Sequence, residues 1–95
     1  MNQERVECPV GQYTQINSDS LASLSFNLQV HKGAVEFRAT TDTTQPDADL
    51  PGLRYAEPWG ERDLAMSDLF QLASAAYIWA KPLGAAATVF IDYGS

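Results

Sequence analysis

Apolar and polar residues alternate along two neighbouring stretches in the first half of the chain. Every second residue from 24 to 30 is apolar, and the alternation resumes over residues 35–39 after Lys32 and Gly33. A period of two is typical of a strand with one buried face and one solvated face. Two such runs joined by a short turn that contains glycine predict a β-hairpin over residues 24–39.

The last third of the chain predicts a second hairpin, with residues 75–80 and 88–93 as its strands and residues 81–84 as its turn. Both strands are apolar on both faces, unlike the strands of the first hairpin. A doubly apolar strand is expected where it lies in the centre of a protein or meets a neighbouring subunit. We interpret these strands as a surface that other chains cover.

One segment before the second hairpin has no single clear pattern. Residues 61–74 fit a strand only if Asp68 is buried, and they also fit a helical stripe with an N-cap at Ser67 or Asp63. We expect one or two helical turns at most around residues 63–74.

Four or more strands with turn signals between them predict a mainly β protein with a single domain. The expected fold is an antiparallel β-sandwich or a jelly-roll-like barrel. Residues 1–20 are polar and weakly patterned, so we expect an extended N-terminal arm that leads into a β-sandwich domain of residues 21–95. A short strand within the arm, over residues 13–17, stays open as an alternative.

Composition and charge narrow the classes of function. A chain of 95 residues, of which 45% are hydrophobic, fits one globular domain. The net charge is −6 and no two basic residues are adjacent, so the chain lacks the basic stripe that binds nucleic acid or an anionic membrane. It also lacks an apolar run of the ~20 residues that a membrane helix needs, and its N-terminus lacks the pattern of a signal peptide. We therefore expect synthesis in a reducing compartment.

The inventory of reactive side chains argues against an enzyme. His31 is the only histidine and lies at a predicted turn, and Cys8 is the only cysteine and lies beside a proline. A nucleophilic site needs a nucleophile, a base and an orienting group, and a zinc site needs three or four ligands. The sequence therefore predicts a protein with no catalytic residues and no cofactor.

Three carboxylates in the polar loop over residues 40–52 are candidate ligands for a metal ion. Asp42, Asp47 and Asp49 share this loop, but an EF-hand that began at Asp47 would place Pro51 at its third ligand position. The alternatives are an irregular calcium site and a solvated acidic loop.

Aromatic and arginine side chains provide the candidate binding residues, because Trp, Tyr and Arg dominate the energetics of protein interfaces. For Trp59 the alternative is a ring folded back onto its own sheet, and for Trp79 it is a core position. Tyr55, Trp59 and Trp79 could instead offer stacking faces to a sugar. The candidate interface residues are Tyr13, Ile16, Trp59, Arg62, Tyr77, Trp79, Phe90 and Tyr93.

The chain resembles small structural proteins of tailed bacteriophages in six short segments, which together span most of its length: YTQIN (13–17), VEFRAT (35–40), GLRY (52–55), GER (60–62), YIWAK (77–81) and VFID (89–92). Those proteins are capsid-decorating (cement) proteins or appendage proteins of the head or tail. They occur in many copies, are often trimeric, and bind a major capsid protein or a tail component. The resemblance implies a homo-oligomer that is made in the host cytoplasm and located in the virion.

The main hypothesis is therefore a non-enzymatic virion structural protein that binds capsid or tail subunits and stabilises or decorates the particle. The alternative is a carbohydrate-binding β-sandwich module for host attachment, with Tyr55 and Trp59 as its stacking rings. A small enzyme or inhibitor is the least favoured class, because the reactive side chains do not form a recognisable set.

Overall fold

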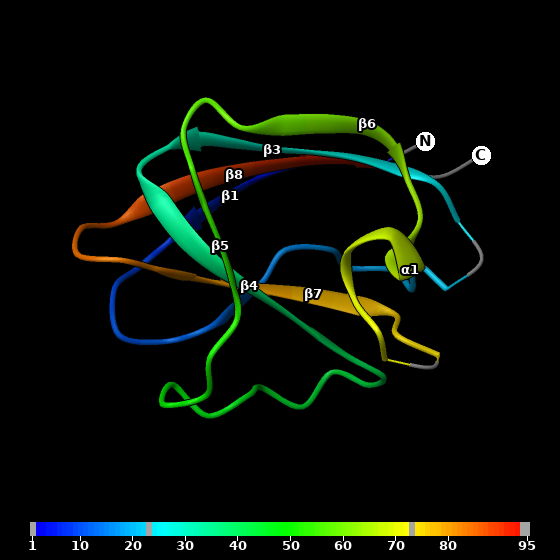
Figure 1. Ribbon diagram of the computed structural model, residues 1–95, viewed down its shortest axis with the longest axis horizontal. Coiled ribbons are helices and arrows are strands. Elements are labelled where there is room, and N and C mark those ends of the chain that lie inside the picture. Colours follow the sequence, from blue (N-terminus) through cyan, green and yellow to red (C-terminus); the bar gives the residue numbers. More distant parts are fainter. Residues whose placement is uncertain (1, 23, 73, 94–95) are drawn as a thin grey trace.

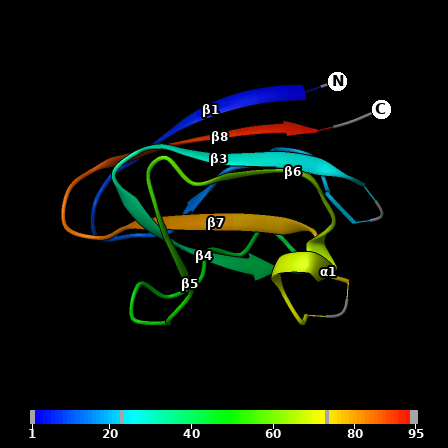
Figure 2. The ribbon, with the colours of Figure 1, turned by 45° about the horizontal axis from the view of Figure 1, so that its top comes forward.

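The computed structural model describes residues 2–22, 24–72 and 74–93. Within these ranges the protein is mainly β, with two antiparallel four-stranded sheets packed on each other and one short helix (Figures 1 and 2). Sheet A has the strand order β1-β8-β3-β6, and sheet B has the order β2-β7-β4-β5. The strands and the helix are β1 (Asn2–Cys8), β2 (Thr14–Gln15), β3 (Phe26–Lys32), β4 (Ala34–Thr40), β5 (Leu53–Ala56), β6 (Gly60–Leu64), α1 (Met66–Leu69), β7 (Tyr77–Pro82) and β8 (Ala87–Tyr93).

The pairing of the strands is that of a jelly roll. The first strand pairs with the eighth, the second with the seventh, the third with the sixth and the fourth with the fifth. One long antiparallel ribbon is thus rolled up, and the contacts of β8 with β3 and of β7 with β4 join its turns into two sheets. The predicted β-sandwich is confirmed, in its jelly-roll form.

The two predicted hairpins are correct as strands and wrong as pairs. β3 belongs to sheet A and β4 to sheet B, and the turn at Gly33 carries the chain from one sheet to the other. β7 and β8 are separated in the same way. Apolar alternation reports that one face of a strand is buried, and a crossing between sheets satisfies it as well as a hairpin does. Gly33 has φ 82° and passes close to Ala87, which explains a glycine at this crossing.

The N-terminal residues differ from the predicted arm. β1 is an edge strand of sheet A and pairs with β8 from Asn2 opposite Tyr93 to Cys8 opposite Ala87. β2 lies within residues 13–17, so the alternative of a short strand there holds. The N-terminal stretch is therefore part of the sandwich. Its weak pattern arises because an edge strand with a solvated outer face buries few side chains.

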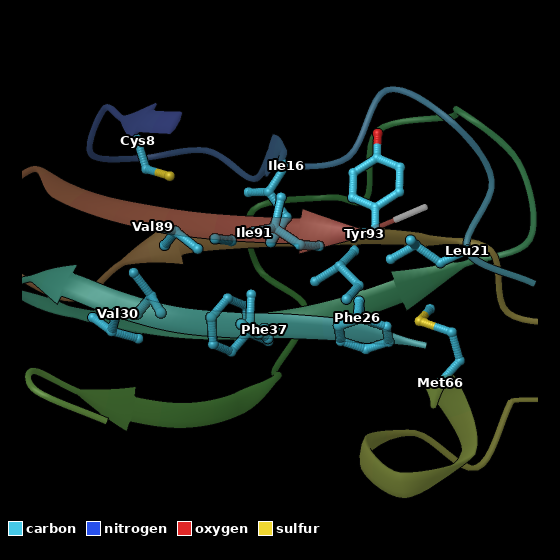
Figure 3. Close-up of a cluster of buried hydrophobic side chains, with 14 of the residues drawn as sticks. Cys8, Ile16, Leu21, Phe26, Val30, Phe37, Met66, Val89, Ile91 and Tyr93 are labelled. Carbon is cyan, nitrogen blue, oxygen red and sulfur yellow. The ribbon is translucent and has the colours of Figure 1, made fainter. Parts of the chain in front are cut away.

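The core lies between the two sheets and is built from their inward-facing side chains (Figure 3). Val30 and Ile91 of sheet A and Phe37 of sheet B are fully shielded from solvent. The single helical turn α1 falls inside the segment 63–74, as predicted, and adds the buried Met66 to the end of the core. Asp68 stabilises this turn, because its carboxylate accepts a hydrogen bond of 2.7 Å from the N–H of Ala65.

Candidate binding surfaces

The predicted interface residues divide into two groups. Four of them lie inside the molecule, where they cannot form a surface: Tyr13, Ile16, Trp79 and Tyr93. The other four reach solvent: Trp59, Tyr77 and Phe90 are partly exposed, and Arg62 is exposed. Of these, Arg62 and Phe90 line the same cleft on sheet A. The structure therefore brings together only one pair of the eight residues at an accessible site.

The loop over residues 41–52 covers the outer face of sheet B. Figure 1 shows this loop (green) on the side of sheet B away from sheet A. The indole N–H of Trp79 donates to the hydroxyl of Thr40 at 2.8 Å, at the start of the loop, and only 5% of Trp79 is exposed. Lys81 donates to the carbonyl of Ala48. The apolar outer face of β7 is thus covered by the chain itself, which corrects the interpretation that another chain must cover it.

Sheet B is fastened to this loop by buried polar groups. The hydroxyl of Tyr13 donates to the carbonyl of Leu50 at 2.7 Å, and the carboxylate of Glu36 accepts from the N–H of Gly52 at 2.9 Å. Burial raises the pKa of Tyr13, and nearby Glu36 raises it further against the opposing effect of Arg38. The hydroxyl therefore stays protonated and remains a donor to the loop.

The rings of Tyr55 and Trp59 stack on each other rather than facing solvent together. Their centroids lie 4.1 Å apart with an interplanar angle of 22°, and Trp59 also packs against Phe37 at 6.1 Å. Trp59 is therefore folded back onto its own core, which is the alternative that the sequence left open. Trp79 lies apart from this pair, beneath the loop. The three rings do not form one platform for a sugar.

An apolar groove of about 560 Å³ opens between β5 and α1; it is called the β5–α1 groove below. Leu53 and Leu72 are 40% and 45% exposed, although both are large apolar side chains. Its lining also includes Leu69 and Phe70 at the end of the helical turn, residues 37–39 of β4, and the polar side chains of Arg38 and Gln71. β5 is an edge strand that pairs only with β4 among the described strands, so its second backbone edge faces the outside of sheet B. The sequence did not indicate this groove, because its lining comes from three segments that are separated in the chain, residues 37–39, 51–53 and 69–72.

A second depression of about 570 Å³ lies on the outer face of sheet A; it is called the sheet A cleft below. Its lining is mostly polar and comes from β3, β6 and β8, with Phe90 as its aromatic member. The sequence indicated Arg62 and Phe90 as binding residues, but it did not indicate the other polar residues of the lining. Those residues occupy the polar positions of strand alternation, where a solvated face is the ordinary interpretation.

The reactive side chains lie apart from one another. The ring of His31 stacks on Phe90, with centroids 5.5 Å apart. Cys8 is buried, and burial together with the nearby Glu7 raises its pKa to about 11, so the thiol is protonated at neutral pH. In the loop, Asp42 accepts a hydrogen bond from the N–H of Thr44. Across the residues that the structure describes, no three His, Cys, Asp or Glu side chains are close enough together to hold a metal ion.

Comparison with known proteins does not add to these observations. We found no match to a family model, to a curated protein or to a solved structure. Within residues 2–22, 24–72 and 74–93, none of the helices has the length and apolar character needed to cross a membrane. A function can therefore be proposed only from the fold and from surface features such as the two depressions described above.

Proposed function

We propose that the chain is a non-enzymatic structural protein of a virion, which binds capsid or tail subunits and so stabilises or decorates the particle. The observation that carries this proposal is the β5–α1 groove, where large apolar side chains are exposed at the start of the edge strand β5. Exposed apolar patches of this kind are typical of surfaces that bind other proteins.

The groove favours an extended segment of a capsid or tail subunit as its occupant. Such a segment would add a strand to the free edge of β5, and its backbone would pair with that edge. Its apolar side chains would pack on Leu53 and Leu72. These two side chains are in contact with water in the isolated protein, so covering them would favour binding. Because β5 spans only Leu53–Ala56, a segment of a few residues would satisfy it.

The architecture is consistent with this role. Jelly rolls are used by viral capsid proteins and by lectins, so the fold agrees with both hypotheses from the sequence and does not choose between them. The net charge of −6 suits docking on a basic patch of a partner subunit. The homo-oligomer, with a trimer as one arrangement, rests on the resemblance alone.

The covering of β7 by its own loop changes how assembly would proceed. The backbone edges of β7 and β8 need no partner strand, since each is flanked by two strands of its own sheet. A subunit built in this way would fold first and dock afterwards. Partner binding would then depend on the groove rather than on completion of the core.

Co-sedimentation with particles that lack the chain tests this proposal. Leu72→Asp places a charge in the β5–α1 groove, while Val10→Asp places the same charge at a side chain that is 54% exposed and does not line the groove. We expect the Leu72 variant to bind at least about tenfold more weakly and the Val10 variant to bind like the unaltered chain. Both should keep the melting temperature of the parent, because neither residue is buried. Equal binding by all three proteins would contradict docking at the groove, and the absence of binding by the unaltered chain would contradict the virion role.

A further inference from the structure

The residues that line the sheet A cleft are direct cross-strand neighbours on three adjacent strands. Gln29 on β3 lies opposite Phe90 on β8 and opposite Gly60 on β6. One pleat further along, Asn27 lies opposite Asp92. All of these side chains point away from the core, because the residues between them, such as Leu28, are the buried ones. Three strands thus present their polar faces to one depression of about 570 Å³.

The polar groups in the cleft are largely free to bind a ligand. Within the described part of the chain, Gln29, Glu61, Arg62 and Asp92 make no side-chain hydrogen bond or ion pair with another residue. Asn27 uses only its carbonyl oxygen, which accepts from the N–H of Asp63 at 2.9 Å, so its amide N–H₂ group remains available. The cleft therefore holds amide donors, a guanidinium donor and carboxylate acceptors within one small volume.

Two features give the cleft its shape. At Gly60 a Cβ atom would lie 3.1 Å from Cγ of Gln29, so the glycine leaves the Gln29 side chain room at the floor. The ring of Phe90 is held nearly parallel to His31, with an interplanar angle of 5°. This stacking supports the ring as a fixed apolar element among polar neighbours.

From this arrangement we infer that the sheet A cleft binds a neutral saccharide. A sugar ring carries hydroxyl groups that donate and accept at once, which planar amide, carboxylate and guanidinium groups match in pairs. It also carries an apolar C–H face that packs on an aromatic ring such as Phe90. The inference goes beyond the proposed structural role, and it does not use the pair of Tyr55 and Trp59.

The lining disfavours the other common ligand classes. Glu61 and Asp92 outnumber Arg62, so the cleft carries one net negative charge and repels phosphates, sulfates and nucleotides. A purely apolar ligand would bury the polar groups of the cleft without giving them hydrogen-bond partners, so its binding would be unfavourable. A cationic ligand would be held by the two carboxylates, and the test below separates it from a saccharide.

Titration of the ¹⁵N-labelled chain with four neutral hexasaccharides (maltohexaose, cellohexaose, mannohexaose and chitohexaose), followed by NMR, tests the inference. With at least one of them, we expect amide shifts confined to residues 27–29, 60–62 and 90–92. Phe90→Ala should weaken this binding about tenfold, through loss of the stacking face. Arg62→Ala should weaken it several-fold, while Arg54→Ala, an exposed arginine on β5 of sheet B, should not change it.

The charge dependence completes the test. Asp92→Asn keeps the size of the side chain and removes its charge, so saccharide binding should change by only a few-fold and should not depend on salt. Shifts at the cleft produced only by spermidine, and lost in Asp92→Asn, would instead identify a cation site and overturn the inference. Shifts located elsewhere, or the absence of shifts with all four hexasaccharides, would overturn it as well.

Discussion

Gly52 offers the sharpest test of how the loop over residues 41–52 is held against sheet B. A Cβ atom at this position would lie 2.5 Å from the carbonyl oxygen of Phe37 and 3.2 Å from the hydroxyl of Tyr13. The nearest atoms belong to the backbone of the central strand β4, which cannot move aside as a flexible side chain can. Gly52→Ala must therefore displace either the strand or the loop.

Both responses are costly. Overpacking a well-packed region costs about 1–3 kcal/mol. Movement of the loop would break the hydrogen bond from the N–H of Gly52 to Glu36, a contact worth about 1.5–3 kcal/mol because the acceptor is charged. Lower entropy of the unfolded chain in the alanine variant offsets about 0.4–1 kcal/mol of this. The expected net loss is about 0.5–2.5 kcal/mol of the free energy of unfolding.

Urea unfolding followed by circular dichroism measures this loss. Gly60→Ala is the matched control, because there the added Cβ meets the flexible side chain of Gln29 at 3.1 Å and no backbone atom. We expect the control to lose less than about 1 kcal/mol, and Gly52→Ala to be clearly less stable than the control. Hydrogen exchange distinguishes the two responses. If the loop moves, the amide at position 52 loses its hydrogen bond to Glu36 and should exchange faster in the variant; if β4 moves instead, it should not. A Gly52 variant as stable as the unaltered chain would refute the close contact between the loop and β4.

Three further predictions concern single side chains. Asn17→Ala should lower the free energy of unfolding by about 2–4 kcal/mol in urea, because it leaves the buried N–H of Ile78 without its 2.7 Å acceptor; a loss below 1 kcal/mol would mean that water replaces the amide. Burial alone would raise the pKa of Glu4, but hydrogen bonds from Tyr93 and the neighbouring loop lower it, so its contribution to stability is present above the ordinary pKa and is lost as the pH falls through the lowered pKa. Melting temperatures from pH 7 to pH 3 should therefore fall less steeply in Glu4→Gln, and parallel curves would count against this assignment. Cys8, buried and with its pKa raised to about 11, should react with a thiol reagent far more slowly in the native protein than in urea, and equal rates would contradict its burial.

Local patterns were sufficient to locate four of the eight described strands. The alternation over residues 24–30 and 35–39 lies within or beside β3 and β4, and the apolar runs near the C-terminus contain most of β7 and β8. The helical turn α1 was also expected in the right segment. These elements depend on neighbours in the sequence and on one buried face, which is the information that periodicity contains.

Strand pairing could not be predicted in the same way. β1 pairs with β8 at nearly the full length of the chain, and nothing in the polar residues of β1 indicates that partner. The covering of β7 could not be predicted for a similar reason. Lys81 and Tyr13 donate hydrogen bonds to the backbone carbonyls of Ala48 and Leu50 in the loop, and backbone carbonyls carry no sequence signal. The apolar outer face of β7 was therefore attributed to contact with another subunit, although the chain supplies that cover itself.

The two surfaces should act independently. The β5–α1 groove and the sheet A cleft share no lining residue, and one is apolar while the other is polar. A segment added at the edge of β5 would extend sheet B and leave the outer face of sheet A open to solvent. Effects of changes at separate sites without shared partners are generally additive. Leu72→Asp should therefore weaken attachment to particles without changing the affinity for a hexasaccharide, and Phe90→Ala should do the reverse. If Leu72→Asp also weakened saccharide binding, the sandwich would transmit strain between its sheets, and a particle-bound subunit could not be assumed to present a working cleft.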